Sequence, residues 1–168
     1  AHKEIAIVQS PQVDEPVRRI TNHIQTTMED SLLKLDLTRD IANRRICAWC
    51  GTNVVSLVWA ATWETDQKYG TEYHQRLKRY HQLSQKNDWD SSLAKMDAKG
   101  DRNVRPSKQK NYPGMKVVKK DAKGITVSGC KVHTSYGPCT PVMTVMPCRA
   151  MTEEDKDFDL VFWTRTDA

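Results

Sequence analysis

The chain has 168 residues and a formal net charge of +5, with 26 Lys and Arg against 21 Asp and Glu. This length suffices for one domain or two small lobes that bury most of their apolar surface. The basic residues are spread along the chain, which disfavours nucleic-acid binding, and no apolar run reaches the roughly 20 residues of a membrane-spanning helix. The first residues contain no apolar signal core, so we expect an intracellular protein of the cytoplasm or an organelle matrix.

The first half of the chain shows helical periodicity. From Val17 to Asn43, apolar residues recur at helical spacing and predict one amphipathic helix, or a broken one. Residues 54–67 are so rich in apolar side chains that they predict a helix buried against others. Residues 72–88 predict a third helix with its apolar face formed by Tyr73, Leu77, Tyr80 and Leu83.

The hydrophobic period changes near residue 95. Residues 115–135 read as strand, Gly-containing turn and strand, which predicts a β-hairpin. Residues 141–147 and 158–166 are two further β-rich runs, and the charged TEEDKD between them predicts a solvated turn. Helices followed by antiparallel strands are typical of the α+β class, with a helical part at 1–94 and a β domain at 95–168.

Five cysteines, Cys47, Cys50, Cys130, Cys139 and Cys148, form no regular disulfide framework. Cys47 and Cys50 make one C-x-x-C, a spacing that suits zinc, an iron–sulfur cluster or a dithiol. No second C-x-x-C follows in the sequence, which disfavours a zinc ribbon. The alternative is that both thiols are small packed side chains without a ligand.

Two polar stretches in the second half are candidates for a binding site. MDAKGDR, residues 96–102, concentrates two carboxylates, an amine, a glycine and a guanidinium. HTSYG, residues 133–137, follows the second strand of the expected hairpin. Composition alone favours a solvated turn with an internal ion pair for the GDR part of the first stretch.

Several motifs occur in one order and spacing between about Arg19 and Thr166: ATWETDQKYGTEYH, MDAKGDR, RPSKQ, GITVSGCKVHTS and MPCRAMTEEDKDFDLVF. In these motifs the chain resembles the flavoproteins that include 4-hydroxybutyryl-CoA dehydratase and 4-hydroxyphenylacetate 3-hydroxylase, and it is more similar to the dehydratase branch. The resemblance implies an acyl-CoA dehydrogenase-like fold with a helical domain, a middle β domain and a C-terminal helical bundle. The chain resembles the end of the first domain and much of the second.

The resemblance implies FAD as the cofactor. The flavin contacts that it implies are Met96, Asp97, Lys99, Gly100, Asp101, Arg102, His133, Thr134 and Ser135. Hydroxyl and backbone groups can satisfy the polar edge of a flavin ring, and Lys99 or Arg102 can meet its charge. Gly100 would let the backbone approach the ligand closely. Two positions depart from the family pattern, with Ala98 in place of a Pro and Tyr136 in place of a small residue.

Cys47 and Cys50 fall beside the place where the dehydratases bind an iron–sulfur cluster through a C-x-x-x-C pair. The spacing in this chain is C-x-x-C, and the remaining cluster ligands of that family lie in the C-terminal bundle. We therefore expect that this chain alone holds no complete cluster. Packed thiols remain the alternative to a cluster shared with a partner chain.

Two classes of function stay open. The first is a fragment or small subunit of a flavin-dependent enzyme that contributes the FAD-facing β domain, acting on a CoA ester as a dehydratase or on a small phenol as a hydroxylase. The second is a non-catalytic structural or assembly subunit that packs against neighbours through Trp59, Trp63, Trp89 and Trp163. Whether the chain itself is an enzyme is open, although His74 and His81 share a helical face and form one candidate proton-transfer pair.

The resemblance also implies a homo- or hetero-oligomer. The family's helical bundle covers the outer faces of both preceding domains, and this chain does not resemble that bundle. We therefore expect exposed apolar helix surface that a partner covers, around Val54, Leu57, Val58 and Ala61.

Overall fold

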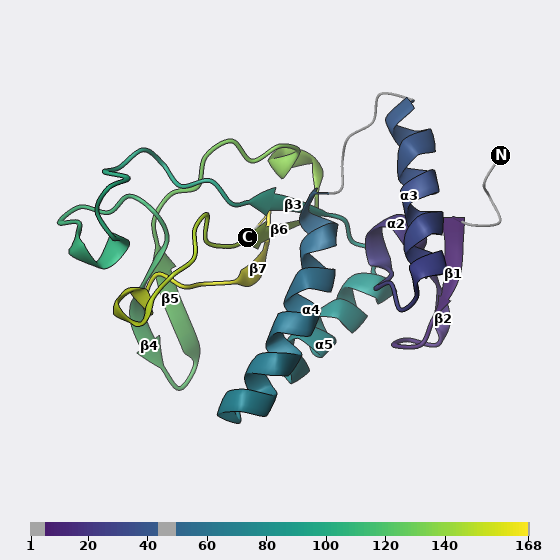
Figure 1. The fold of residues 1–168 in the computed structure, drawn as a ribbon, viewed down its shortest axis with the longest axis horizontal. Helices are drawn as coiled ribbons and strands as arrows, with labels where there is room; N and C mark the ends of the chain where they lie inside the picture. The colour runs from purple at the N-terminus through teal and green to yellow at the C-terminus, as the bar shows by residue number, and fades with distance from the viewer. Residues whose placement is uncertain (1–5, 44–49, 168) are drawn as a thin grey trace. The chain divides into compact units, whose positions relative to one another are not determined.

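The computed structural model describes residues 6–43 and 50–167. The chain divides into two compact units, Ala1–Ser91 and Ser92–Ala168. Figure 1 shows the helix-rich first unit in purple to teal and the strand-containing second unit in green to yellow. The structure contains both helices and antiparallel strands, as expected for the α+β class.

The first unit begins with a β-hairpin that the hydrophobic pattern did not predict. Strands β1 (Ile7–Ser10) and β2 (Glu15–Arg18) pair antiparallel. Asp14 closes the connecting turn with a φ of 54°, and its backbone N–H donates to the Ser10 carbonyl at 2.9 Å. Val17, expected to open a helix, pairs with Val8 in this hairpin instead.

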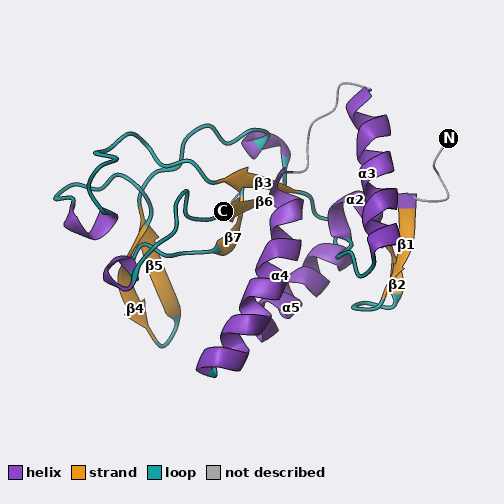
Figure 2. Cartoon of the chain, viewed as in Figure 1, coloured by secondary structure: helices purple, strands orange, loops and turns teal. Residues whose placement is uncertain are grey.

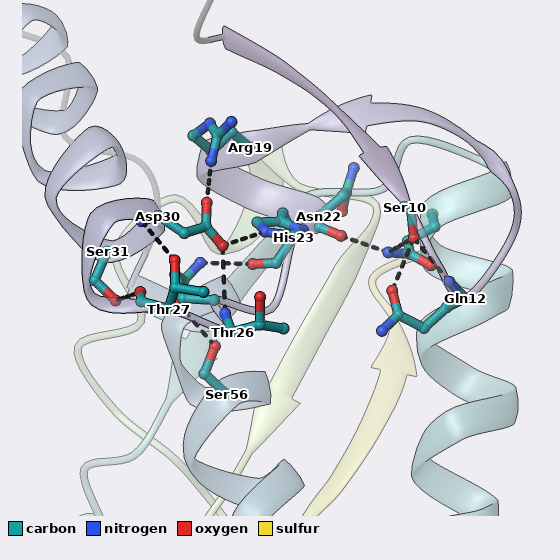
Figure 3. A network of polar contacts seen from close by, with 12 residues as sticks. Ser10, Gln12, Arg19, Asn22, His23, Thr26, Thr27, Asp30, Ser31 and Ser56 are labelled. Carbon is teal, nitrogen blue, oxygen red and sulfur yellow. Dashed lines mark hydrogen bonds and ion pairs between the residues drawn. The ribbon is translucent and has the colours of Figure 1, made fainter.

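Of the two alternatives for residues 17–43, the broken helix is the one observed. Helix α2 (Arg19–Asn22) covers four residues, and α3 (Met28–Asn43) begins after an interruption. The Asp30 backbone N–H donates to the Thr27 hydroxyl at 3.1 Å, so Thr27 caps the start of α3. Arg19 donates to the Asp30 carboxylate, whose other oxygen lies 2.5 Å from His23 Nε2 (Figure 3), and these contacts attach α3 to α2.

Helices α4 (Cys50–Tyr69) and α5 (Tyr73–Lys86) meet at a corner formed by the DQKYGTEYH stretch. Gly70 takes a φ of 63°, and its N–H donates to the Asp66 carbonyl at 2.9 Å, which ends α4. The Asp66 carboxylate accepts the backbone N–H groups of Tyr73 at 3.0 Å and His74 at 2.9 Å. A side chain of α4 thus satisfies the first free N–H groups of α5.

The buried face of α5 agrees only in part with the apolar pattern: Leu77 is buried and Tyr80 half-buried as expected, but the face also includes polar residues. Tyr73 and Leu83 are each 49% exposed, whereas the buried residues are His74, Leu77, His81, Ser84 and Gln85. The Gln85 amide donates to the Ser10 hydroxyl at 2.9 Å and to the Asn22 carbonyl at 2.7 Å. Hydrogen bonds of this kind offset the cost of burying polar groups, and they allow a polar face to turn inward.

Helix α4 contributes part of the core of this unit. The Trp59 ring meets the rings of His74 and His81 edge-on, with centroid distances of 4.7 and 5.8 Å. Val54 and Val55 are buried, but Leu57 is 69% exposed and Trp63 is 54% exposed, so the expected helix buried against others is covered on one side only. Among the described residues, no helix is both long enough and apolar enough to cross a membrane.

The second unit contains short strands joined by long loops (Figure 2). Strands β4 (Lys116–Asp121) and β5 (Gly124–Ser128) form the expected antiparallel hairpin. Strand β6 (Val142–Val145) lies between β3 (Ser91–Ala94) and β7 (Phe162–Arg165) in a three-stranded sheet. β6 and β7 pair antiparallel, which confirms the two predicted β-rich runs.

The charged TEEDKD segment is exposed, as expected for a solvated turn, except at Asp155. It contains the short 3₁₀ helix η3 (Glu153–Asp155), and Asp155 is fully buried. The carboxylate of Asp155 accepts from Arg105, from the Ser107 backbone N–H at 3.1 Å and from the Thr152 hydroxyl at 3.0 Å. Burial by itself raises the pKa of Asp155, but these hydrogen bonds outweigh burial and hold its pKa well below the usual range. Asp155 therefore connects its own segment to the loop that contains Arg105 and Ser107.

The two leucines of α5 provide a direct test of its orientation. Leu77 is 3% exposed, so Leu77→Ala should lower the free energy of unfolding by about 2–5 kcal/mol. Leu83→Ala, the matched control at an exposed position, should change it by less than about 0.5 kcal/mol. Urea unfolding followed by circular dichroism measures both values. Equal losses for the two variants would contradict the observed face.

His81 should make the stability of the first unit depend on pH. Burial, with His23 nearby as the smaller cause, lowers the pKa of His81 from 6.5 to about 4. Between these pH values the unfolded chain binds a proton that the folded chain does not bind, so the free energy of unfolding falls as pH falls. The slope from His81 should reach at most about 1.4 kcal/mol per pH unit.

Urea unfolding of the wild type and of His81→Gln between pH 7 and 4 isolates this contribution. The variant should lose part of the slope, and the exposed His133→Gln control should retain it. Parallel pH profiles for the wild type and His81→Gln would refute the assignment.

Candidate functional site

The structure brings the ends of the two candidate stretches together. Asp97 and Lys131 form an isolated antiparallel β-bridge, and the Val132 N–H donates to the Met96 carbonyl at 2.9 Å. His133 follows Val132 directly in the chain. Main-chain hydrogen bonding therefore holds the start of residues 96–102 next to the segment that leads into residues 133–137.

The Asp97 side chain reinforces this bridge. One carboxylate oxygen accepts from Lys131 Nζ at 2.5 Å, and the other accepts from the Tyr112 hydroxyl at 2.8 Å and the Cys148 thiol at 2.9 Å. The side chains of Asp97 and Lys131 are only 10% and 8% exposed. Burial alone raises the pKa of Asp97, but the hydrogen bonds from Cys148, Lys131 and Tyr112 outweigh it, and the pKa lies below the usual range. Asp97 is therefore an anion with three internal donors.

A cavity of about 280 Å³ lies beside this carboxylate. Of the predicted loop residues, Met96, Asp97, Gly100, Asp101 and Arg102 line it. Lys99 is exposed and is not part of the lining. The remaining lining residues, which the sequence did not single out as a site, are Ala98, Gln109, Tyr112, Cys148 and Arg149. Of these, Cys148 and Arg149 belong to the MPCRAM motif, whereas Tyr112 lies between the motifs that carry the resemblance.

Internal contacts shape the loop that borders the cavity. The Gln109 amide donates to the carbonyl oxygens of Asp101 at 2.7 Å and Val104 at 2.9 Å. A Cβ at Gly100 would lie 2.9 Å from Gln109 Oε1 and 3.3 Å from Pro113 Cδ. The close approach at Gly100 is thus made within the chain, and a side chain there would require Gln109 to shift.

The HTS segment lies next to the bridge but does not line the cavity. His133 and Ser135 are exposed, and Thr134 is half-buried. His133 has a φ of 56° and Tyr136 a φ of 59°, so two non-glycine residues adopt the left-handed conformation within four positions. Such residues cost about 1–2 kcal/mol each. If His133, Thr134 and Ser135 contact a flavin, as the resemblance implies, they do so outside this cavity.

Two cations are available at the cavity wall. Arg102 and Arg149 both line it, and the structure gives neither guanidinium a hydrogen bond or an ion pair to any of the residues it describes. A guanidinium presents five N–H donors in a planar fork that suits carboxylates, phosphates and carbonyl edges. The cavity can therefore bind a polar, electron-rich group.

The expected iron–sulfur ligands cannot be followed here. Cys47 lies outside the described residues, and Cys50 is described only as the first residue of α4. In the part of the chain that the structure describes, no group of three or more His, Cys, Asp or Glu side chains could hold a metal ion. The pair remains a prediction.

Comparisons with known proteins match the whole chain. The family described as 4-hydroxyphenylacetate 3-hydroxylase N terminal matches residues 1–168, which extends the resemblance beyond the expected start near Arg19. The 4-hydroxybutyryl-CoA dehydratase/vinylacetyl-CoA-Delta-isomerase of Clostridium aminobutyricum is 32% identical over 171 residues, covering 99% of this chain and 35% of that protein. The chain thus spans about a third of the length of this relative.

Solved structures share the fold. An oxygen-tolerant archaeal 4-hydroxybutyryl-CoA dehydratase from N. maritimus is 30% identical and superimposes with a TM-score of 0.93 over 99% of this chain and 34% of its own. The oxygenase component HpaB of 4-hydroxyphenylacetate 3-monooxygenase, in a complex with FAD, superimposes with a TM-score of 0.78 at 19% identity over 98% of this chain and 34% of its own. At that identity the second likeness shows a common fold.

Proposed function

The chain belongs to the 4-hydroxyphenylacetate 3-hydroxylase N-terminal family, and on that premise we propose that it is the flavin-facing part of a flavin-dependent enzyme similar to 4-hydroxybutyryl-CoA dehydratase. The proposal applies equally to a fragment and to a small subunit. The observation that carries it is the cavity lined by the MDAKGDR loop, with Arg102 and Arg149 available to a ligand. The FAD complex of HpaB supports the choice of cofactor.

The residues at the cavity fit one part of a flavin cofactor. Its volume of about 280 Å³ is at the lower end of ligand pockets, so it suits a ring edge or a phosphate group and not a whole dinucleotide. Arg102 and Arg149 would bind the electron-rich groups of the cofactor, and His133, Thr134 and Ser135 would contact it beyond the cavity. When bound, a flavin supplies electron transfer that protein side chains lack.

The reaction would be a dehydration of a CoA ester, the chemistry in the name of the 32% identical relative. Hydroxylation of a small phenol is the alternative, because the HpaB structures share the fold. An acyl-CoA dehydrogenase-like arrangement, with 95–168 as the flavin-facing β domain, is part of this proposal. In either reaction the catalytic groups would come from other parts of the enzyme or from partner chains, since the chain covers about a third of these relatives.

Substitutions at Arg102 and Lys99 distinguish flavin binding in the cavity from a general effect of surface charge. Arg102→Gln should weaken flavin binding by roughly 10- to 100-fold, because a hydrogen bond to a charged group contributes about 1.5–3 kcal/mol. Lys99→Gln removes the same charge three residues away, outside the lining, and should change affinity less than about twofold. Titration of the protein with oxidised flavin, followed by flavin fluorescence and visible absorption, gives both affinities. A wild type that binds no flavin would refute the proposed function.

A structural role is the second candidate, and the exposed apolar face of α3 favours it. Met28, Leu32 and Leu35 follow each other at helical spacing and are 77%, 53% and 43% exposed. On α4, Leu57 and Ala61 are exposed as expected for an uncovered surface, but Val54 is buried. Apolar faces of this kind are typical of interaction surfaces. We propose that they contact a partner chain or a second copy of this chain.

The α3 face predicts association that depends on these leucines. Sedimentation equilibrium of the wild type should show a mass that rises with concentration, and Leu32→Glu with Leu35→Glu should weaken association by at least about tenfold. Arg39→Glu adds a negative charge at an exposed position of the same helix and serves as the control. A concentration-independent monomer for the wild type would exclude self-association through this face.

A further inference from the structure

We propose that Asp97 is a positioning residue that turns Tyr112 and Cys148 into hydrogen-bond acceptors, so that this cavity wall binds an N–H group of the ligand, such as the imide N–H of a flavin ring. The inference rests on the proposed flavin function and specifies which edge of the cofactor this wall recognises. Asp97 would then act through its neighbours and not by touching the cofactor.

The hydrogen bonds of Asp97 determine the polarity of the wall. A tyrosine hydroxyl and a cysteine thiol each have one proton, and both protons are directed at the same Asp97 oxygen, at 2.8 and 2.9 Å. With its proton committed, each atom can offer only lone pairs to another group. Tyr112, Cys148 and Asp97 all line the cavity, so this wall presents acceptors and no donor from these side chains.

Other contacts keep Tyr112 in this role. The ring of Tyr112 packs edge-on against Phe158 at a centroid distance of 5.3 Å, which restricts its rotation. Burial, followed by the hydrogen bond to Asp97, raises the pKa of Tyr112, so the phenol retains its proton at physiological pH. Lys131 holds the Asp97 carboxylate charged from the other side.

The same cavity is also lined by two hydrogen-bond donors, Arg102 and Arg149. Both guanidiniums only donate, whereas the Asp97 wall only accepts. A matching ligand therefore has an N–H next to carbonyl or anionic oxygens. The imide edge of a flavin has this pattern, with one N–H between two carbonyl groups, and a bare phosphate lacks the N–H.

A flavin methylated at the imide nitrogen tests this recognition. The wild type should bind unmodified flavin at least about tenfold more tightly than the N-methylated flavin, because the methyl group removes the donor. Tyr112→Phe should reduce this preference to about threefold or less while leaving the Asp97–Lys131 pair intact. Tyr69→Phe, at an exposed tyrosine of the first unit, should keep the full preference.

Asp97→Asn tests the positioning role itself. An amide can donate to Tyr112, so the phenol proton is released toward the cavity and the preference should again fall. The ¹³Cζ resonance of Tyr112 should titrate at lower pH in this variant than in the wild type, which a general loss of packing elsewhere would not produce. If Asp97→Asn fails to fold because Lys131 loses its counter-charge, Tyr112→Phe still decides the question.

The outcomes separate the two proposals. No binding of either flavin to the wild type overturns the proposed function, and this inference with it. Flavin binding with equal affinity for the methylated and unmethylated forms, or a preference that persists in Tyr112→Phe, overturns the inference and leaves the proposed function standing.

Discussion

The arrangement around the cavity of the second unit depends on the carboxylate of Asp97. Asp97 accepts from Tyr112, Lys131 and Cys148, which are 15, 34 and 51 residues away in the sequence. The strands of this unit are short, so these side-chain hydrogen bonds add to the few main-chain contacts between the segments, such as the Asp97–Lys131 bridge. A buried charge that lost these donors would be strongly unfavourable, which makes the arrangement specific as well as stable. The walls of the cavity take their positions from this requirement.

Other aspartate side chains also connect separate segments of the chain. Asp30 attaches α3 to α2, Asp66 caps α5 from α4, and Asp155 ties two loops of the second unit. In each case one carboxylate accepts several hydrogen bonds from groups on separate segments. Hydrogen bonds to carboxylates therefore connect separate segments in both units.

Sequence patterns predicted the parts of the fold whose causes are local. The β4–β5 hairpin followed from alternating residues and a turn that ends at Gly124, whose φ of 142° suits glycine. The polar part of the buried α5 face was missed because Gln85 is buried by partners 63 and 75 residues away. Asp155 was read as solvated for the same reason, since its partners at Arg105 and Ser107 are about 50 residues distant.

The cavity shows the same limit of sequence reasoning. Residues 96–102 were recognised through the family resemblance, but periodicity and composition contained no signal for Tyr112 as a neighbour of Asp97. The two are brought together only by folding. Lys99 is exposed and is not among the residues that line the cavity. Spacing within an irregular loop does not reveal which residues will line a cavity.

The α4–α5 corner has a kinetic consequence. The contacts of Asp66 with the N–H groups of Tyr73 and His74 span only 7 and 8 residues. Closing so short a loop costs little chain entropy and is fast, whereas the ties of Asp97 and Asp155 must first bring together segments up to about 50 residues apart. The helical corner is therefore suited to form early, and the cavity of the second unit can be completed only late in folding.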